Sequence, residues 1–114
     1  MHVTRLAQAR PYEAPRHSAI STLRLQGWDA SPTKGFWVGL SQILPGGGAE
    51  WDATPLEKVY VVLDGEVTVT TEAGDACLAE LDSCWLEPGE ARSVENRTNR
   101  TATMLVVMPY PPGR

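Results

Sequence analysis

The sequence has few of the side chains that hold transition metals. Among 114 residues there are two histidines, His2 and His17, and two cysteines, Cys77 and Cys84. Zinc, iron, copper and nickel sites in proteins are built mainly from imidazole and thiolate ligands. Two cysteines are too few for a disulfide framework, and their apolar neighbours favour reduced, buried packing residues. An isolated histidine near the N-terminus is more often a surface residue than a ligand.

The sequence also lacks an excess of positive charge and any long apolar run. Ten lysines and arginines stand against 14 acidic residues, for a net charge of −4, which argues against nucleic acid as a partner. No run of about 18 apolar residues is present, so we expect no membrane-spanning helix. The N-terminal segment is charged and has no apolar signal region, which predicts a cytoplasmic protein. Its length and ordinary composition favour one globular domain.

Helical periodicity is nearly absent, and short segments rich in β-branched and aromatic residues dominate instead. Asp64-Gly65, between two such segments, is the strongest hairpin signal in the chain. The spacing of the segments predicts an all-β sandwich or barrel. The candidate strands are 17–28, 35–45, 49–53, 58–74, 76–89, 91–98 and 101–110.

The first 16 residues contain Pro11 and Pro15 and do not read as a core strand. We therefore divide the chain into an N-terminal arm, residues 1–16, and a β-barrel domain, residues 17–114. The arm is too polar to fill its own barrel, and sheet edges need covering. We expect a homodimer in which the arm crosses to the partner.

Two segments resemble the motifs of the cupin family: "PGGGAEWDATPLEKVYVVLDGEV" (45–67) and "LDSCWLEPGEARSVEN" (81–96). The likeness rests on framework residues, namely the three glycines 46–48, Gly65, Gly89 and Asn96, and covers roughly residues 35–110. It implies a small single-domain cupin, an all-β, jelly-roll-like antiparallel β-barrel. The family's four metal-ligand positions fall on Asp52, Thr54, Lys58 and Arg92.

None of these four positions keeps the residue that the family uses for a metal. Charged Lys58 and Arg92 have no lone pair to donate, so together they repel a metal and attract an anion. We therefore predict no metal and no cofactor. An alternative registration places Glu50, Asp52 and Glu57 at ligand spacing, which would suit a hard cation such as Ca²⁺, Mg²⁺ or Mn²⁺.

Strand alternation predicts the rest of a small-molecule pocket. We assign Lys58 and Asp52 as candidate catalytic residues. The candidate substrate-binding residues are Arg92, Thr54, Glu50, Tyr60 and Trp37. In the competing interpretation, Lys58 and Arg92 pair with Asp52 and Glu50 in a purely structural network. Taken individually, Trp37, Trp51 and Trp85 are expected to be packing residues.

Three functions remain open from the sequence. The first is a metal-independent enzyme, an isomerase, epimerase or lyase that acts on a small carboxylated metabolite. In it Lys58 serves as base or amine nucleophile, Asp52 exchanges protons and Arg92 holds the substrate carboxylate. The second is a non-catalytic module that binds or senses an anionic metabolite. The third is an inert structural barrel.

Overall fold

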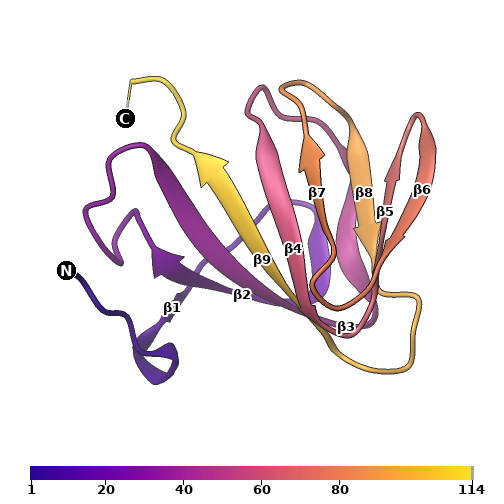
Figure 1. The fold of residues 1–114 in the computed structure, drawn as a ribbon, viewed down its shortest axis with the longest axis horizontal. Coiled ribbons are helices and arrows are strands. Elements are labelled where there is room, and N and C mark those ends of the chain that lie inside the picture. The colour runs from indigo at the N-terminus through magenta and orange to yellow at the C-terminus, as the bar shows by residue number, and fades with distance from the viewer. Residues whose placement is uncertain (114) are drawn as a thin grey trace.

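The computed structural model describes residues 1–113, and these form an antiparallel all-β fold with one 3₁₀ turn, η1 (Leu6–Gln8) (Figure 1). The predicted fold class is confirmed. Among the described residues, no helix is long and apolar enough to cross a membrane. The strands are β1 (Arg10–Pro11), β2 (His17–Gln26), β3 (Phe36–Asp52), β4 (Lys58–Asp64), β5 (Val67–Thr71), β6 (Gly74–Leu78), β7 (Ser83–Leu86), β8 (Arg92–Glu95) and β9 (Ala102–Pro109).

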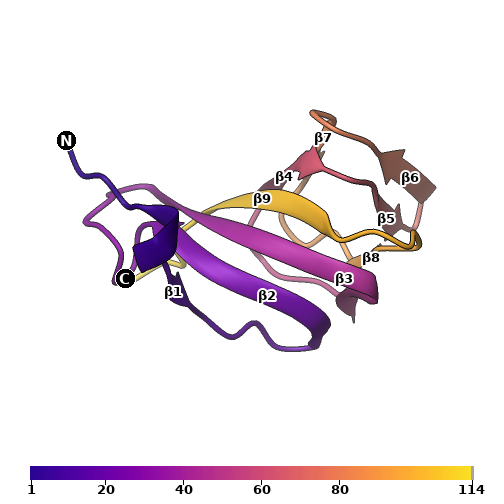
Figure 2. The same cartoon turned by 90° about the horizontal axis from the view of Figure 1, so that it is seen from below.

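The strands pair in the order β6-β5-β8-β3-β9-β4-β7, with β2 added to β3 and β1 to β2. The long strands β2, β3 and β9 lie side by side in one layer, and the shorter strands from β4 to β8 curl round at one end (Figure 2). The curled sheet is a nearly closed barrel. Its interior holds the apolar core, in which Ile43, Val62 and Val67 are fully buried.

Strand β3 combines the two predicted strands 35–45 and 49–53 into a single strand of 17 residues. It pairs with β2 and β9 in its first part and with β8 in its last part. Gly46 has φ +79°, and a Cβ on Gly48 would lie 1.8 Å from the carbonyl oxygen of Val94. The glycines therefore let β3 bend and approach β8 without a break.

The predicted hairpin at Asp64-Gly65 is wrong. The turn is tight, since Gly65 has φ +79°, but β4 pairs with β7 and β9 whereas β5 pairs with β6 and β8. Closure of the barrel decides these partners, and the two-residue turn carries the chain from one part of the sheet to another. The predicted turn at residues 72–75, by contrast, does join the paired strands β5 and β6. The predicted strand 76–89 is divided between β6 and β7.

Asn96, one of the framework residues, is fully buried and links three segments. Its side-chain amide donates to the carbonyl oxygens of Ile43 at 2.8 Å and Arg100 at 2.7 Å. The side-chain oxygen Oδ1 of Asn96 accepts hydrogen bonds from the backbone N–H and the hydroxyl of Thr98. Every polar atom of the amide therefore has a partner, which fixes the loop between β8 and β9.

Three predictions of burial fail, those for Cys77, Trp51 and Trp85. Cys77 is exposed and Cys84 only partly buried, and both are free thiols. Trp37 is buried as predicted, but Trp51 is 47% exposed and Trp85 56% exposed. Alternation in the four-residue β7 turns the indole of Trp85 outward, where it donates a hydrogen bond to Glu57 at 2.9 Å.

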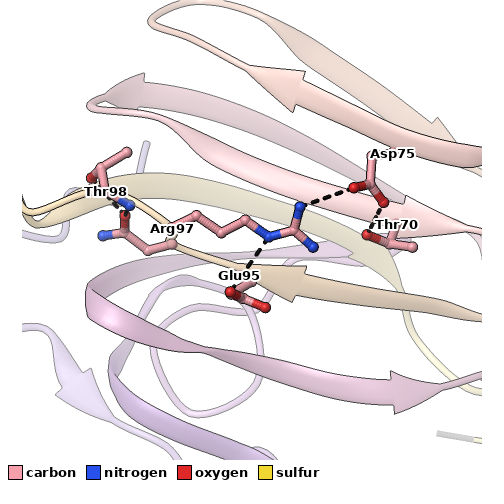
Figure 3. Close-up of polar contacts among 6 residues, drawn as sticks. Thr70, Asp75, Glu95, Arg97 and Thr98 are labelled. Carbon is pink, nitrogen blue, oxygen red and sulfur yellow. Dashed lines mark hydrogen bonds and ion pairs between the residues drawn. The ribbon is translucent and has the colours of Figure 1, made fainter.

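An ion-pair network on the surface joins β6 to β8 and the segment that follows it (Figure 3). Arg97 contacts the Asp75 carboxylate at 2.9 Å and the Glu95 carboxylate at 3.4 Å. The Thr70 hydroxyl and then Arg97 lower the pKa of Asp75. These exposed side chains lie outside the cavity described below, so we assign them a structural role.

The N-terminal segment lies on the chain's own barrel. Arg10 and Pro11 pair with Arg24 and Leu23 of β2, and the Tyr12 ring packs edge-on against Trp37, with 5.7 Å between ring centroids. The segment that the sequence predicts to be too polar to fill its own barrel therefore does pack against it. The predicted boundary after residue 16 and the homodimer stay predictions, and Arg114 lies outside the described residues.

Candidate functional site

A cavity of about 260 Å³ opens between the inner face of the barrel and the N-terminal segment. The apolar wall comes from β3 and β9 and includes Trp37, Ile43, Met104, Val106 and Met108. The polar part of the lining, called the polar end below, is formed by His17, Asp52, Thr54, Lys58, Tyr60 and Arg92. Residues 12–15 complete the wall on the N-terminal side.

Strand ends bring the polar residues together. Asp52 ends β3, Lys58 begins β4 and Arg92 begins β8. Asp52 and Arg92 are paired directly across the two strands. Together with Thr54, these three residues occupy the family's four metal-ligand positions. All four line one cavity.

Arg92 is only 7% exposed and is held from two sides. Its Nε donates to the hydroxyl of Tyr60 at 2.8 Å, and its Nη1 donates to the backbone carbonyl of Glu50 at 3.1 Å. Burial raises the pKa of Tyr60, and the charge of Arg92 opposes that rise. The guanidinium is thus fixed in orientation. Among the described residues, no carboxylate forms an ion pair with it within 4 Å.

Lys58 is even more buried, at 3% exposure, and its Nζ lies 3.2 Å from the hydroxyl oxygen of Thr54. Burial is the main cause that lowers the pKa of Lys58. The charge of Arg92 lowers it further, and Asp52 opposes both. Within residues 1–113 no carboxylate forms an ion pair with this amine. Lys58 and Arg92 are therefore two buried cations that repel each other across one cavity.

The Asp52 carboxylate is directed to other partners. It accepts a hydrogen bond from the backbone N–H of Ala53 at 2.9 Å and lies 3.4 Å from the Arg16 guanidinium. The competing interpretation of a closed network with Lys58 and Arg92 is thus not what the structure shows. Glu50 is exposed and contributes only its backbone carbonyl, so its predicted side-chain role in binding has no support from this geometry.

The residues present do not fit the metal that cupins commonly hold at this place. Two of the four positions are cations, and neither of the others is an imidazole or a thiolate. The alternative set of Glu50, Asp52 and Glu57 is not brought together either, since Glu57 is exposed and accepts from Trp85. Across residues 1–113, no group of three or more His, Cys, Asp or Glu side chains is placed to hold a metal ion.

Sequence reasoning missed the contribution of the N-terminal side. Glu13 and His17 line the cavity, and burial lowers the pKa of His17. The one available signal was Gly39, in the middle of β3. A Cβ there would lie 2.7 Å from the Tyr12 hydroxyl oxygen and 3.0 Å from the Trp37 ring, and a glycine inside a strand often marks such a close approach.

Arg24 is a further cavity residue that the sequence did not reveal. Its guanidinium carbon lies 3.9 Å from the centroid of the Tyr12 ring, 4.6 Å from that of Trp37 and 5.5 Å from that of Trp28. Stacking on aromatic rings holds this cation at the cavity wall. Burial lowers its pKa, although Tyr12 opposes the change.

Comparison with known proteins agrees with this architecture. The sequence model of the cupin domain matches residues 39–108, which is more than half of the chain. The chain belongs to the cupin family. A protein of Mycobacterium tuberculosis named beta-D-galactosidase Rv1717 is 51% identical to this cupin over 111 residues, which cover 97% of this chain and 96% of the relative.

Two solved structures show the same fold. The polyketide cyclase RemF from Streptomyces resistomycificus superimposes with a TM-score of 0.84 at 15% identity, over 96% of this chain and 79% of the other. A cupin-superfamily sugar phosphate isomerase from Silicibacter pomeroyi gives a TM-score of 0.74 at 26% identity. That match covers 82% of this cupin and 61% of the isomerase chain.

Proposed function

We propose that this cupin binds a β-galactoside in its barrel cavity and hydrolyses the glycosidic bond. The observation that carries the proposal is the end-to-end relative, half identical in sequence, that is named a β-D-galactosidase. The cavity adds physical support, because its volume of about 260 Å³ lies near the lower limit of ligand pockets. That size suits one sugar ring better than a long chain.

The walls of the cavity match the two kinds of surface that a sugar presents. The indole of Trp37 and the side chains of Met104 and Met108 offer an apolar wall for the C–H face of the ring. In the same cavity Thr54, Lys58, Tyr60 and Arg92 offer hydrogen-bonding groups for ring substituents. Since the polar groups are held by one another, the site is largely formed before a ligand arrives.

Hydrolysis of a glycoside commonly uses two carboxyl groups on either side of the scissile bond. The cavity offers Asp52, whose side chain is 35% exposed, and Glu13 on its exposed N-terminal wall. We assign Asp52 to the anomeric carbon, where it stabilises positive charge or activates water. Glu13 protonates the leaving oxygen, which departs toward solvent. No metal takes part, since the donor set does not suit one.

The test is the release of p-nitrophenol from p-nitrophenyl β-D-galactopyranoside by protein made in a host without β-galactosidase. We expect turnover to fall about 100-fold or more in Asp52→Asn, the usual range for loss of one acid–base group. Glu13→Gln should show a similar fall with lactose, whose leaving hydroxyl needs protonation, and a smaller one with the nitrophenyl substrate. The matched control is Asp75→Asn, which removes an exposed carboxylate far from the cavity. No hydrolysis by wild type, or equal rates in wild type and Asp52→Asn, would overturn the proposal.

A second candidate is a sugar isomerase or epimerase, one of the reaction types that the sequence predicts. The specific observation in its favour is Lys58, a buried amine whose pKa is lowered and which faces the same cavity as Asp52. A lowered pKa makes an amine a better general base, because a larger share of it is unprotonated at a given pH. The likeness to a sugar phosphate isomerase is consistent with it.

Two variants separate the two reactions. Glu13→Gln removes the leaving-group acid and should abolish hydrolysis but not isomerisation. Lys58→Met removes the isomerisation base and should abolish isomerisation, whereas hydrolysis should persist with a higher KM, because Lys58 also binds the sugar. Each variant is incubated with a β-galactoside and, separately, with a reducing galactose derivative, and the products are analysed by NMR. Exchange of solvent deuterium into the sugar without cleavage favours the isomerase, and free aglycone favours the hydrolase.

A further inference from the structure

We propose that the sugar recognised by this cavity carries an acidic group, a phosphate or a carboxylate, that is bound between Lys58 and Arg92. The inference rests on the proposed function for the sugar, and it adds the chemical class of the substrate. Two of the four positions at which other cupins hold a metal, Lys58 and Arg92, here form an anion site.

The first argument is that the two cations are buried without a counter-charge. Lys58 is 3% exposed and Arg92 is 7% exposed, so water solvates neither fully. Every ion pair in the described chain involves another arginine, namely Arg10, Arg16, Arg97 or Arg100. A buried charge is costly unless it is paired, which favours a ligand that brings the missing negative charge.

The second argument is the total charge around the cavity. The cations that line it are Arg24, Lys58 and Arg92, and the carboxylates are Glu13 and Asp52. Of the two carboxylates, Glu13 is exposed and Asp52 is shared with Arg16 outside the lining. The polar end therefore keeps an excess of positive charge, and a neutral sugar would leave it uncompensated.

The third argument is the orientation of the donors. The hydrogen bonds of Arg92 to Tyr60 and to the carbonyl of Glu50 use its Nε and Nη1, which leaves N–H groups on Nη2. Among the described residues the Lys58 ammonium donates one hydrogen bond, to Thr54, and an ammonium has three donors. An arginine and a lysine whose positions are fixed match the several acceptor oxygens of a phosphate or carboxylate.

Isothermal titration calorimetry tests the inference with four probes: inorganic phosphate, galactose 6-phosphate, galacturonate and galactose. We expect inorganic phosphate to bind wild type, and at least one acidic sugar to bind about tenfold or more tightly than galactose, as charge-assisted hydrogen bonds allow. Tight binding of galactose 6-phosphate identifies a phosphorylated substrate, and tight binding of galacturonate identifies a carboxylated one. Both results support the acidic class.

Arg92→Gln should remove this preference, while the control Arg100→Gln, an exposed arginine paired with Asp64, should keep it. Near-ultraviolet circular dichroism checks that each variant is folded, and Lys58→Gln replaces Arg92→Gln if the latter does not fold. Equal affinity for galactose and both acids, or a preference that survives the cavity variants, overturns the inference. If the acids bind but no galactoside is cleaved, the hydrolase proposal falls and the anion site stands.

Discussion

Arg92 donates a hydrogen bond from its Nε to the hydroxyl of Tyr60 at 2.8 Å, and both side chains are more than nine-tenths buried. They come from strands β8 and β4, which do not pair with each other. The contact therefore crosses the barrel interior and fixes the guanidinium where a cupin metal would be held. The contribution of this hydrogen bond to the free energy of unfolding can be measured with variants, as can those of neighbouring residues.

Tyr60→Phe should lower the free energy of unfolding by about 1 to 3 kcal/mol, because it leaves a buried guanidinium N–H without a partner. The matched control is Tyr12→Phe. Tyr12 lines the same cavity, and the described residues offer its hydroxyl no hydrogen-bond partner, so little change is expected. Urea unfolding of both variants gives the comparison, and equal losses would contradict the assigned role of the contact.

Lys58 should make the stability of the protein depend on alkaline pH. Its pKa in the folded state lies below the ordinary value of 10.5, so between these two pKa values the unfolded chain binds more protons than the folded one. Stability in this window rises with pH. Wild type should therefore gain stability relative to Lys58→Met as the pH rises toward 10.5. Urea unfolding of both proteins at several pH values measures this difference. Parallel curves of unfolding free energy against pH would contradict the lowered pKa of Lys58 in the folded state.

Gly48→Ala should destabilise the fold by about 2 kcal/mol or more, since the new Cβ would lie 1.8 Å from the carbonyl oxygen of Val94. Strand β3 would then have to move away from β8. Gly35→Ala is the control, because a Cβ there meets nothing within 4 Å. Thermal unfolding of the two variants checks this, and the idea fails if both shift the midpoint equally.

The purified protein should contain no stoichiometric transition metal, because the family's ligand positions hold two cations and no imidazole. Elemental analysis of protein prepared without a histidine tag is the measurement. One equivalent of iron, zinc, nickel, copper or manganese that resists dialysis would contradict it.

The protein should form a homodimer, as the sequence predicts. Several large apolar side chains are exposed on the single chain, and burying them would favour association. They include Phe36, Leu44, Trp51, Leu81 and Trp85. Sedimentation velocity at micromolar concentration measures the state, and a monomer alone would rule the dimer out.

The fold class was within reach of the sequence because its signals are local. Alternating β-branched residues and the turn at residues 72–75 predict strands wherever they occur. The resemblance to the two cupin motifs placed the ligand positions, including Asp52, Lys58 and Arg92. The absence of histidine at those positions is likewise a property of the sequence, and it predicts that the chemistry of this cupin differs from that of a typical metal centre.

Tertiary structure alone decided which strands pair and which side chains meet. The Asp64-Gly65 turn was recognised, yet its flanking strands pair elsewhere because the barrel can close only by pairing segments far apart in sequence. For the same reason the sequence did not show that Tyr12 and Arg24 would line the cavity. Their contacts with Trp37 depend on where the N-terminal segment lies, and that is set by packing rather than by any local pattern.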